Sequence, residues 1–350
     1  MQFYDFKEIE ERVILIGVQT EQDEDVAASL DELEELAATA GAVTVGKVIQ
    51  NREAVHPGTY IGKGKIEEVA ALLAAYDANG VICDDELSPA QMNNLERELD
   101  CKVMDRTLLI LDIFAGRATT SEGKIQVELA QLRYRSARLV GLRESLSRLG
   151  GGIGTRGPGE KKLETDRRLI RTRISALKAE LAQVEKHREL IRGKRTRGNL
   201  KTAAIVGYTN AGKSTLLNTL TGAGILAEDK LFATLDPTTR VLELKDGQQI
   251  LLTDTVGFIR KLPHHLVEAF KSTLEEAKYA DYIIHVVDAS NPQAELQMHT
   301  VYETLRELGA TGKKIITLLN KQDQVQGESL RDFRADYTVK CSARTAEGLE

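Results

Sequence analysis

Short apolar runs alternate with amphipathic segments over the first third of the chain. The apolar runs predict strands at 13–18, 43–48, 81–83 and 102–104, and the segments after them predict helices at 25–40, 66–76, 89–99 and 107–115. In the first helical segment Leu30, Leu33 and Leu36 fall on one side. This alternation predicts a small doubly wound parallel sheet, which we assign to an N-terminal α/β domain of residues 1–118.

From Ile125 onward the apolar positions follow steps of three and four residues. The first series is Ile125, Leu129, Leu132, Leu139, Leu142, Leu146 and Leu149, and the second is Leu163, Ile170, Ile174, Leu177, Leu181, Val184 and Ile191. Heptad-like seams on consecutive segments predict an antiparallel, coiled-coil-like αα-hairpin within residues 119–198. The break between the helices, 150–159, holds six glycines in ten residues.

Residues 199–350 return to alternating strands and helices. We expect strands at 203–206, 241–244, 249–253, 282–287 and 315–319, and helices at 214–220, 265–280 and 294–308. Asp246-Gly247 is a turn signal between the second and third strands. The chain stops at Glu350, where another helix of such an α/β domain would begin, so we expect a domain that lacks its last helix.

Composition narrows the class of protein. The chain of 350 residues is 42% hydrophobic and 29% charged, as is ordinary for a globular protein, and its three cysteines show no paired spacing. It contains neither a signal-peptide pattern at its start nor an apolar run long enough to span a bilayer. We therefore expect a cytoplasmic protein with no membrane-spanning segment.

Charge is distributed unevenly along the chain. The net charge is −6, yet residues 133–198 hold 19 Lys and Arg against 7 Asp and Glu. The remainder is correspondingly acidic. One basic segment in an acidic protein predicts an arm that faces a polyanion.

A phosphate-binding loop follows the apolar run 203–206. Its G-x-x-x-x-G-K-[ST] pattern consists of Gly207, Tyr208, Thr209, Asn210, Ala211, Gly212, Lys213 and Ser214, with Thr215 next. Glycines allow backbone N–H groups to point at a phosphate, and the following helix directs its positive end there. Lys213 is expected to contact the β- and γ-phosphates, and the Ser214 hydroxyl to bind Mg²⁺.

Two further motifs complete the phosphate site. The sequence Asp254-Thr255-Val256-Gly257 ends an apolar run, so that Asp254 can reach the metal through water and Gly257 can offer its N–H to a γ-phosphate. The connecting segment 223–240 is expected to be the first switch and to supply a threonine to Mg²⁺. Spacing alone does not choose among its candidates, Thr234, Thr238 and Thr239.

Guanine specificity is predicted by Asn320-Lys321-Gln322-Asp323 and by Ser342-Ala343, which Arg344 follows. The Asp323 carboxylate accepts hydrogen bonds only, which suits the N1–H and 2-amino donors of guanine and not adenine. Asn320 can tie this loop to the phosphate loop. Four motifs in this order predict a site for GTP and GDP.

Hydrolysis is expected to be slow in isolation. The residue after Gly257 is Phe258, whereas many GTPases place there a glutamine that orients the attacking water. Asn210 either helps to hold a monovalent cation, which would stabilise the transition state, or stabilises the turn. We predict that K⁺ or a partner raises turnover.

Three glycine-rich or basic segments are open to two interpretations. The tip at 150–159 is either a finger inserted into RNA or a loose loop, and we favour RNA contact because glycine density and positive charge coincide. The segment 60–65 is either a phosphate or RNA contact or, as we favour, a turn with solvated lysines. The segment 193–199 is predicted to be a linker that is either a hinge or an RNA contact.

Together these residues closely resemble the HflX family of translation-factor-class GTPases. The more specific similarities are 60–65, 116–123, 150–159 and 232–240. The resemblance implies a monomeric GTPase that binds the large ribosomal subunit and its rRNA, not DNA, with its hairpin tip directed toward the peptidyl-transferase region. It also implies that the protein splits stalled or idle ribosomes under stress such as heat.

The resemblance extends to individual residues. Related bacterial GTPases carry Phe-Thr-Thr-Leu, which selects Thr234 as the switch ligand although this chain has Ala233 before it. The implied metal ligands are Ser214, Thr234 and, through water, Asp254. The implied catalytic set is Lys213, Thr234, Gly257 and Asn210, and the switch residues expected near nucleotide are Phe232, Ala233, Thr234, Leu235 and Asp236. ATP binding by the N-terminal domain is suggested only weakly.

Two other functions fit the same motifs. One is an RNA-processing or signalling GTPase switch that acts on a different partner. The other is an RNA-clamping module in which the basic hairpin binds RNA and nucleotide has a structural part.

Overall fold

The structure, a computed structural model, describes residues 10–21, 25–149, 158–197, 200–222, 224, 230–262, 266, 271–325 and 330–350. Its contacts divide into two compact units, each described here by itself. The first comprises Met1–Ile113 with Gln131–Ser175, and the second Phe114–Ala130 with Ala176–Glu350. Most of the glycine-rich tip and the pair His264-His265 lie outside the described residues.

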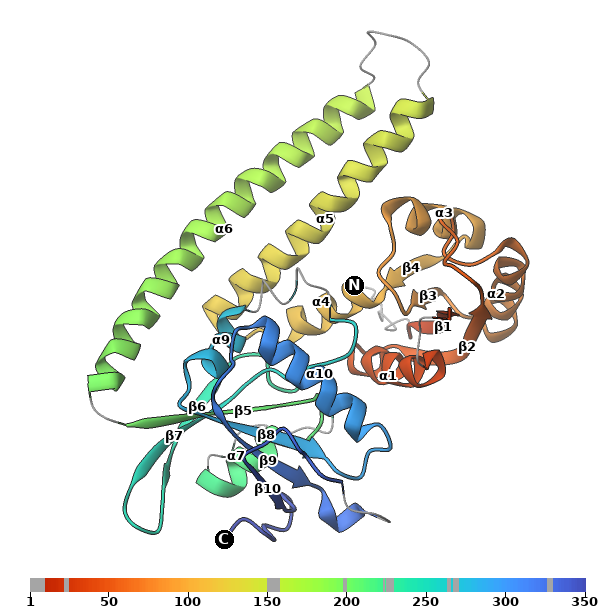
Figure 1. The fold of residues 1–350 in the computed structure, drawn as a ribbon. Coiled ribbons are helices and arrows are strands. Elements are labelled where there is room, and N and C mark those ends of the chain that lie inside the picture. Colours follow the sequence, from red (N-terminus) through yellow and green to blue (C-terminus); the bar gives the residue numbers. More distant parts are fainter. Residues whose placement is uncertain are drawn as a thin grey trace, which may run out of the picture. The chain divides into compact units, whose positions relative to one another are not determined.

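The first unit contains the predicted parallel sheet. Its strands are β1 (Arg12–Gln19), β2 (Val43–Asn51), β3 (Gly80–Cys83) and β4 (Lys102–Asp105), in the order β2-β1-β3-β4. All three pairings are parallel. The helices that follow the strands are α1 (Val26–Thr39), α2 (Lys63–Tyr76), α3 (Pro89–Leu99) and α4 (Arg106–Arg117) (Figure 1). The expected doubly wound fold is confirmed.

Alternating residues of β1 face the two sides of this sheet. Ile14, Ile16 and Val18 belong to a core shared with α2 and α3. On the opposite side, a Cβ added to Gly17 would meet Leu30 of α1, which is fully buried. Because the strand is buried on both faces, its sequence is a continuous apolar run.

Helix ends follow local sequence signals. Asp25 caps α1 by accepting a hydrogen bond from Ala28 N. Ser88 and Gln91 form a capping box at the start of α3, with Pro89 in its first turn. Tyr60, in the segment 60–65, has a φ of 66° and is buried, and Lys63 begins α2. That segment is therefore a turn that leads directly into a helix.

Two long helices follow α4. They are α5 (Ser121–Leu149) and α6 (Pro158–Arg197), and they lie side by side and antiparallel (Figure 1). Within the second unit, Glu122 of α5 pairs with Arg188 of α6, and Leu177 is fully buried. The expectation of a linker at 193–199 was wrong for most of that segment, because α6 continues through Arg197.

Buried charges connect helices to the sheet in the first unit. Arg106 is 1% exposed and pairs with Asp84 at 2.8 Å and with Glu32. Asp105, also buried, accepts hydrogen bonds from Tyr134 Oη at 2.8 Å and from Arg138 at 2.5 Å. Removing one member of such a buried group would leave a charge unpaired, so these contacts specify how α5 packs on this unit.

The second unit is built on a larger sheet. Its strands are β5 (Lys201–Gly207), β6 (Thr238–Glu243), β7 (Gln249–Asp254), β8 (Tyr282–Asp288), β9 (Lys314–Asn320) and β10 (Tyr337–Lys340), in the order β10-β9-β8-β5-β7-β6. Among the described strands, β6 pairs antiparallel with β7 and the other pairings are parallel. The helices are α7 (Lys213–Thr221), α9 (Lys271–Tyr279) and α10 (Ala294–Glu307), with a short 3₁₀ turn at Gln322–Gln324.

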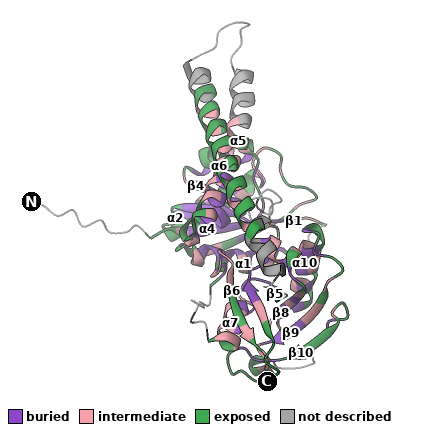
Figure 2. Ribbon diagram, turned by 90° about the vertical axis from the view of Figure 1, so that its left-hand side faces the viewer, coloured by how far each residue is buried: buried purple, intermediate pink, exposed green. Residues whose placement is uncertain are grey.

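The core of this unit lies between the central strands and helix α7. Ile205, Leu216 and Val286 are fully buried there. Figure 2 shows buried residues along the central strands of this sheet. The phosphate loop thus leaves a rigid strand and enters a helix whose inner face is fixed by packing. Across the part of the chain that the structure describes, no helix has both the length and the apolar character needed to cross a membrane.

Candidate nucleotide-binding site

The phosphate loop joins β5 to α7. Gly212, directly before the helix, has a φ of 95°, a conformation that residues with a side chain rarely adopt. A side chain there would also strike the Asn320 amide. The helix N-terminus and the loop N–H groups that precede it are the elements that bind phosphate in such loops.

Lys213 lies inside this loop. Its Nζ donates a hydrogen bond to the backbone carbonyl of Tyr208 at 2.7 Å, and its side chain is buried. Burial lowers the pKa of Lys213 to about 8, although the charge of Asp254 opposes this shift. A bound phosphate would add negative charge beside Nζ and favour the protonated form.

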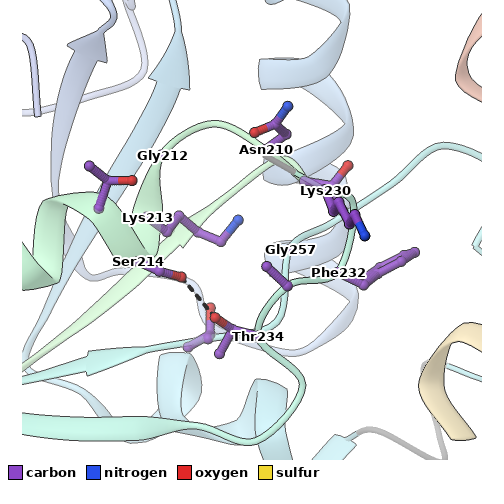
Figure 3. Close-up of a pocket in the computed structure, with 12 residues that line it drawn as sticks. Asn210, Gly212, Lys213, Ser214, Lys230, Phe232, Thr234 and Gly257 are labelled. Carbon is purple, nitrogen blue, oxygen red and sulfur yellow. Dashed lines mark hydrogen bonds between the residues drawn. The ribbon is translucent and has the colours of Figure 1, made fainter. Parts of the chain in front are cut away.

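The switch threonine lies against the loop. Thr234 Oγ1 is 2.8 Å from Ser214 Oγ (Figure 3). It is also 3.1 Å from Asp254 Oδ2, to which Ser214 Oγ donates at 2.7 Å. Of the other two candidates, both in β6, Thr239 contacts the Thr253 hydroxyl at 2.9 Å. Thr234 is therefore the candidate placed beside Ser214 and Asp254.

This oxygen cluster fits Mg²⁺ chemically. Asp254 is fully buried, and its Oδ1 has no hydrogen-bond partner among the described residues. Burial raises the pKa of Asp254, while Lys213 and the two hydroxyl groups lower it in opposition. A buried carboxylate oxygen without a partner beside two hydroxyl groups is typical of a site for a hard cation that binds oxygen.

Gly257 and Phe258 pack directly against the phosphate loop. A Cβ on Gly257 would lie 2.8 Å from Thr209 Cα and 2.9 Å from Lys213 Nζ, so this position has no room for a side chain. Phe258 N donates to Gly207 O at 3.0 Å, and Thr209 N donates to Phe258 O at 2.8 Å. The Phe258 side chain is 1% exposed and is absent from the pocket lining.

The pocket brings together most of the predicted phosphate and switch residues. Its lining is Thr209, Asn210, Gly212, Lys213, Ser214, Thr215, Lys230, Phe232, Ala233, Thr234, Thr255 and Gly257. Lys230 was not predicted, because no motif marks a lysine at that position. Tyr208, Leu235 and Val256 are buried and do not line the pocket.

Asp236 is turned to a different partner. Its two carboxylate oxygens accept hydrogen bonds from Thr119 and Thr120, at the start of α5. Asp236 is also absent from the pocket lining. In this geometry the Asp236 side chain therefore does not face the nucleotide pocket.

The guanine motifs meet at the carboxyl ends of β9 and β10. Asn320 Nδ2 donates to Ala211 O at 2.8 Å, and Ala343 N donates to Asn320 Oδ1 at 2.8 Å. Lys321, with a φ of 61°, pairs with Asp288 at 2.7 Å. Asp323 lies in the 3₁₀ turn and is exposed, as is Arg344, whereas Ser342 is fully buried.

Three families match successive parts of the chain. They are described as "GTP-binding GTPase N-terminal" at residues 27–115, "GTP-binding GTPase Middle Region" at 117–195 and "50S ribosome-binding GTPase" at 202–321. The last range contains the phosphate loop, the switch segment 223–240, the Asp254 motif and Asn320.

Whole-chain relatives carry one common name. The chain is 71% identical to the "GTPase HflX" of Lacrimispora saccharolytica over 347 residues, covering 99% of this chain and 82% of the relative. It is 46% identical to the "GTPase HflX" of Escherichia coli K12, covering 97% and 80%. A GTP-binding protein of the archaeon Sulfolobus solfataricus, solved in complex with GDP, is 26% identical with a TM-score of 0.51, covering 97% and 95%.

Fold and site together define a P-loop GTPase: the phosphate loop, the switch segment and the Asp254 motif line one pocket at the end of a mainly parallel sheet, and Asn320 of the guanine motif is hydrogen-bonded to the phosphate loop. The relatives make the assignment more specific. The chain belongs to the HflX family of GTPases. The predicted fold class, family and GTPase activity are thereby confirmed.

Proposed function

We propose that this GTPase binds the large ribosomal subunit through its basic hairpin and, in its GTP state, separates stalled or idle ribosomes in the cytoplasm under stress. The observation that carries the proposal is an arginine-lined groove on α6. Arg167, Arg168 and Arg171 line it together with Glu164, Thr165, Thr172 and Ser175, so its three arginines outnumber its one carboxylate. Arginine binds phosphate bidentately, and a row of arginines on one helix suits an RNA backbone.

Two further facts support a ribosomal partner. The family that matches the nucleotide domain is described as "50S ribosome-binding GTPase". The basic segment 133–198 also lies almost entirely within the range of the middle-region family, 117–195. The two matches therefore support both parts of the proposal, a polyanionic partner and a GTPase cycle.

The site residues divide the work of hydrolysis. We assign Mg²⁺ to Ser214, Thr234 and, through water, Asp254, where it would neutralise charge on the β- and γ-phosphates. Lys213 adds a positive charge beside the same phosphates. The backbone N–H of Gly257 donates to the γ-phosphate, and Thr234 closes the pocket from the switch side.

Sedimentation with purified large subunits tests the proposal. Binding should be stronger with a non-hydrolysable GTP analogue than with GDP, and it should weaken as salt rises because phosphate contacts release counterions. The triple variant Arg167→Glu, Arg168→Glu and Arg171→Glu should lose binding. The control is a second triple variant with the same change of charge. It carries Lys245→Glu, Arg306→Glu and Lys314→Glu, which replace exposed residues of the nucleotide domain.

The outcomes distinguish the alternatives. Absence of subunit binding in any nucleotide state would favour the RNA-processing or signalling switch. Binding that does not depend on nucleotide would favour the RNA-clamping module. Equal loss of binding in both triple variants would mean that net charge, rather than the α6 groove, determines affinity.

A further inference from the structure

The start of helix α5 is capped by a residue far away in sequence. Asp236 Oδ2 accepts hydrogen bonds from Thr119 N at 3.0 Å, Thr119 Oγ1 at 2.7 Å and Thr120 N at 2.9 Å. Asp236 Oδ1 accepts one from Thr120 Oγ1 at 2.5 Å. A carboxylate that accepts N–H bonds at a helix start is stabilised by both the bonds and the helix dipole.

The cap continues into the helix itself. Thr120 Oγ1 accepts a hydrogen bond from Gly123 N at 3.0 Å, so Thr120 is the N-cap residue and also donates to Asp236. Gly123 leaves room for this arrangement, because a Cβ there would collide with Asp236 Oδ1. We call this group of Asp236, Thr119, Thr120 and Gly123 the Asp236 cap.

A second contact holds the other end of the switch segment. The Phe232 ring packs edge-to-face on Phe114 of α4, with ring centroids 4.6 Å apart. Both side chains are at most 2% exposed. Phe232 has a φ of 54°, a conformation unusual for a bulky residue, so packing holds the backbone there against its preference.

Thr234 lies midway between these two contacts. Phe232 precedes it by two residues and Asp236 follows it by two. The intervening segment is too short to move independently of its ends. Phe114, Thr119, Thr120, Gly123 and the switch all belong to the second unit, so the contacts lie within one compact body.

We infer that Asp236 is a positioning residue for GTP hydrolysis: by capping α5 it holds the switch segment so that Thr234 stays beside Ser214 and Asp254. The inference rests on the proposed role of Thr234. Asp236 is not among the residues that line the phosphate pocket, so it would act on the reaction through the backbone of 232–236.

Two variants break the cap from opposite sides. Asp236→Ala removes the acceptor, and Gly123→Ala introduces the colliding Cβ without changing Asp236. Each should lower kcat for GTP by about 10-fold, the expected effect of losing charge-assisted hydrogen bonds that order the catalytic segment. KM and the affinity for GDP should stay within about 2-fold, because GDP has no γ-phosphate for the switch to contact.

Matched variants separate positioning from general damage. Gly116→Ala in α4 is the glycine control, because a Cβ there meets nothing within 4 Å. Asp236→Asn should give an intermediate kcat, since its amide keeps one acceptor oxygen. Thr120→Ser retains the hydroxyl and should match the original chain, whereas Thr120→Val should not.

Thr234→Ala, assayed in parallel, separates this inference from the proposed function. Loss of hydrolysis in Thr234→Ala with unchanged kcat in Asp236→Ala and Gly123→Ala would overturn the inference alone. Unchanged hydrolysis in Thr234→Ala would overturn the proposed role of Thr234 and the inference with it. A parallel fall of kcat and GDP affinity in the cap variants would reveal a merely structural role and would also overturn the inference.

Discussion

Asn320 and Ala211 join the guanine side of the site to its phosphate side. The Asn320 amide donates to the Ala211 carbonyl in the phosphate loop at 2.8 Å, while its oxygen accepts from Ala343 N. Asn320 is 2% exposed, so both bonds are shielded from solvent. One side chain therefore fixes the distance between the loop that binds phosphate and the loops that recognise the base.

Replacing Asn320 by alanine should weaken nucleotide binding. Ala211 O and Ala343 N would be left buried without a partner, at a cost of about 1–3 kcal/mol each, which predicts at least a tenfold higher Kd for GDP. Asn320→Asp keeps the acceptor for Ala343 N but places a buried carboxylate against the Ala211 carbonyl oxygen, so it should weaken binding at least as much as alanine. Titration with a fluorescent GDP analogue should rank the original chain above both variants; equal affinities would contradict this role.

Gly257→Ala should separate binding of GTP from binding of GDP. The new Cβ would lie within 3 Å of Thr209 Cα and Lys213 Nζ, so the switch backbone must withdraw from the γ-phosphate position. We expect hydrolysis to fall by about 100-fold, as when a backbone donor to the reacting group is lost. Gly64→Ala in α2, where a Cβ meets nothing within 4 Å, is the control. Measured affinity for GDP should change far less than affinity for a GTP analogue.

Periodicity predicted the elements well because apolar positions report which face of an element is buried. The segment 89–99 was predicted from sequence as a helix and is one, since Ser88, Pro89 and Gln91 mark its start. The end of α6 was missed. Gly193 suggested a linker, yet one glycine costs only about 1 kcal/mol in a helix, and the lysine and arginine residues around it favour helix.

Local motifs predicted the phosphate loop, the Asp254 motif and the guanine motifs, because each is contiguous in sequence. They left open which switch threonine lies beside the phosphate loop, and in the structure Thr234 contacts Ser214 and Asp254. The family resemblance, rather than a local motif, grouped Asp236 with the residues expected near nucleotide. Its actual partners, Thr119 and Thr120, are more than 110 residues away, and no local pattern encodes such a pairing.

Acid should destabilise the nucleotide domain through His285 and Asp332. His285 is 1% exposed; burial lowers its pKa, nearby Asp332 opposes this shift, and Lys213 adds to it. Burial acts to raise the pKa of Asp332, but His285 and the hydrogen bonds from Thr317 and Tyr302 hold it well below its usual range. Both groups thus bind protons less readily in the folded state than in the unfolded state.

The direction of the pH effect follows from these shifts. The contribution of His285 is fully present above its unfolded pKa of about 6.5 and is lost as pH falls below that value. The contribution of Asp332 is lost only below about pH 4, its unfolded pKa. Thermal unfolding measured from pH 8 to pH 4 should show Tm falling below pH 6.5, and His285→Gln should flatten the curve between pH 6.5 and 5. An unchanged slope in that variant would contradict the assignment, and His299→Gln is the histidine control in α10.

Potassium should accelerate hydrolysis through Asn210. Asn210 lines the phosphate pocket beside Gly212 and Lys213, while Phe258 is buried away from it and cannot orient water. Asn210 has a φ of 59°, which asparagine tolerates better than most residues, so a turn-forming role alone is the competing explanation. The variant Asn210→Gly separates the two, because glycine keeps the backbone conformation and removes the side-chain oxygen.

We expect the original chain to hydrolyse GTP several-fold faster in K⁺ than in Na⁺ at equal ionic strength, since a cation beside the phosphates stabilises developing charge. Asn210→Gly should equalise the two rates without weakening GDP binding. Asn291→Gly, in a loop after β8, is the matched asparagine control and should keep the K⁺ effect. Each rate should be measured with and without large ribosomal subunits. Equal rates in K⁺ and Na⁺ under both conditions would mean that Asn210 acts only in the turn. Another group in the pocket would then determine the rate of hydrolysis.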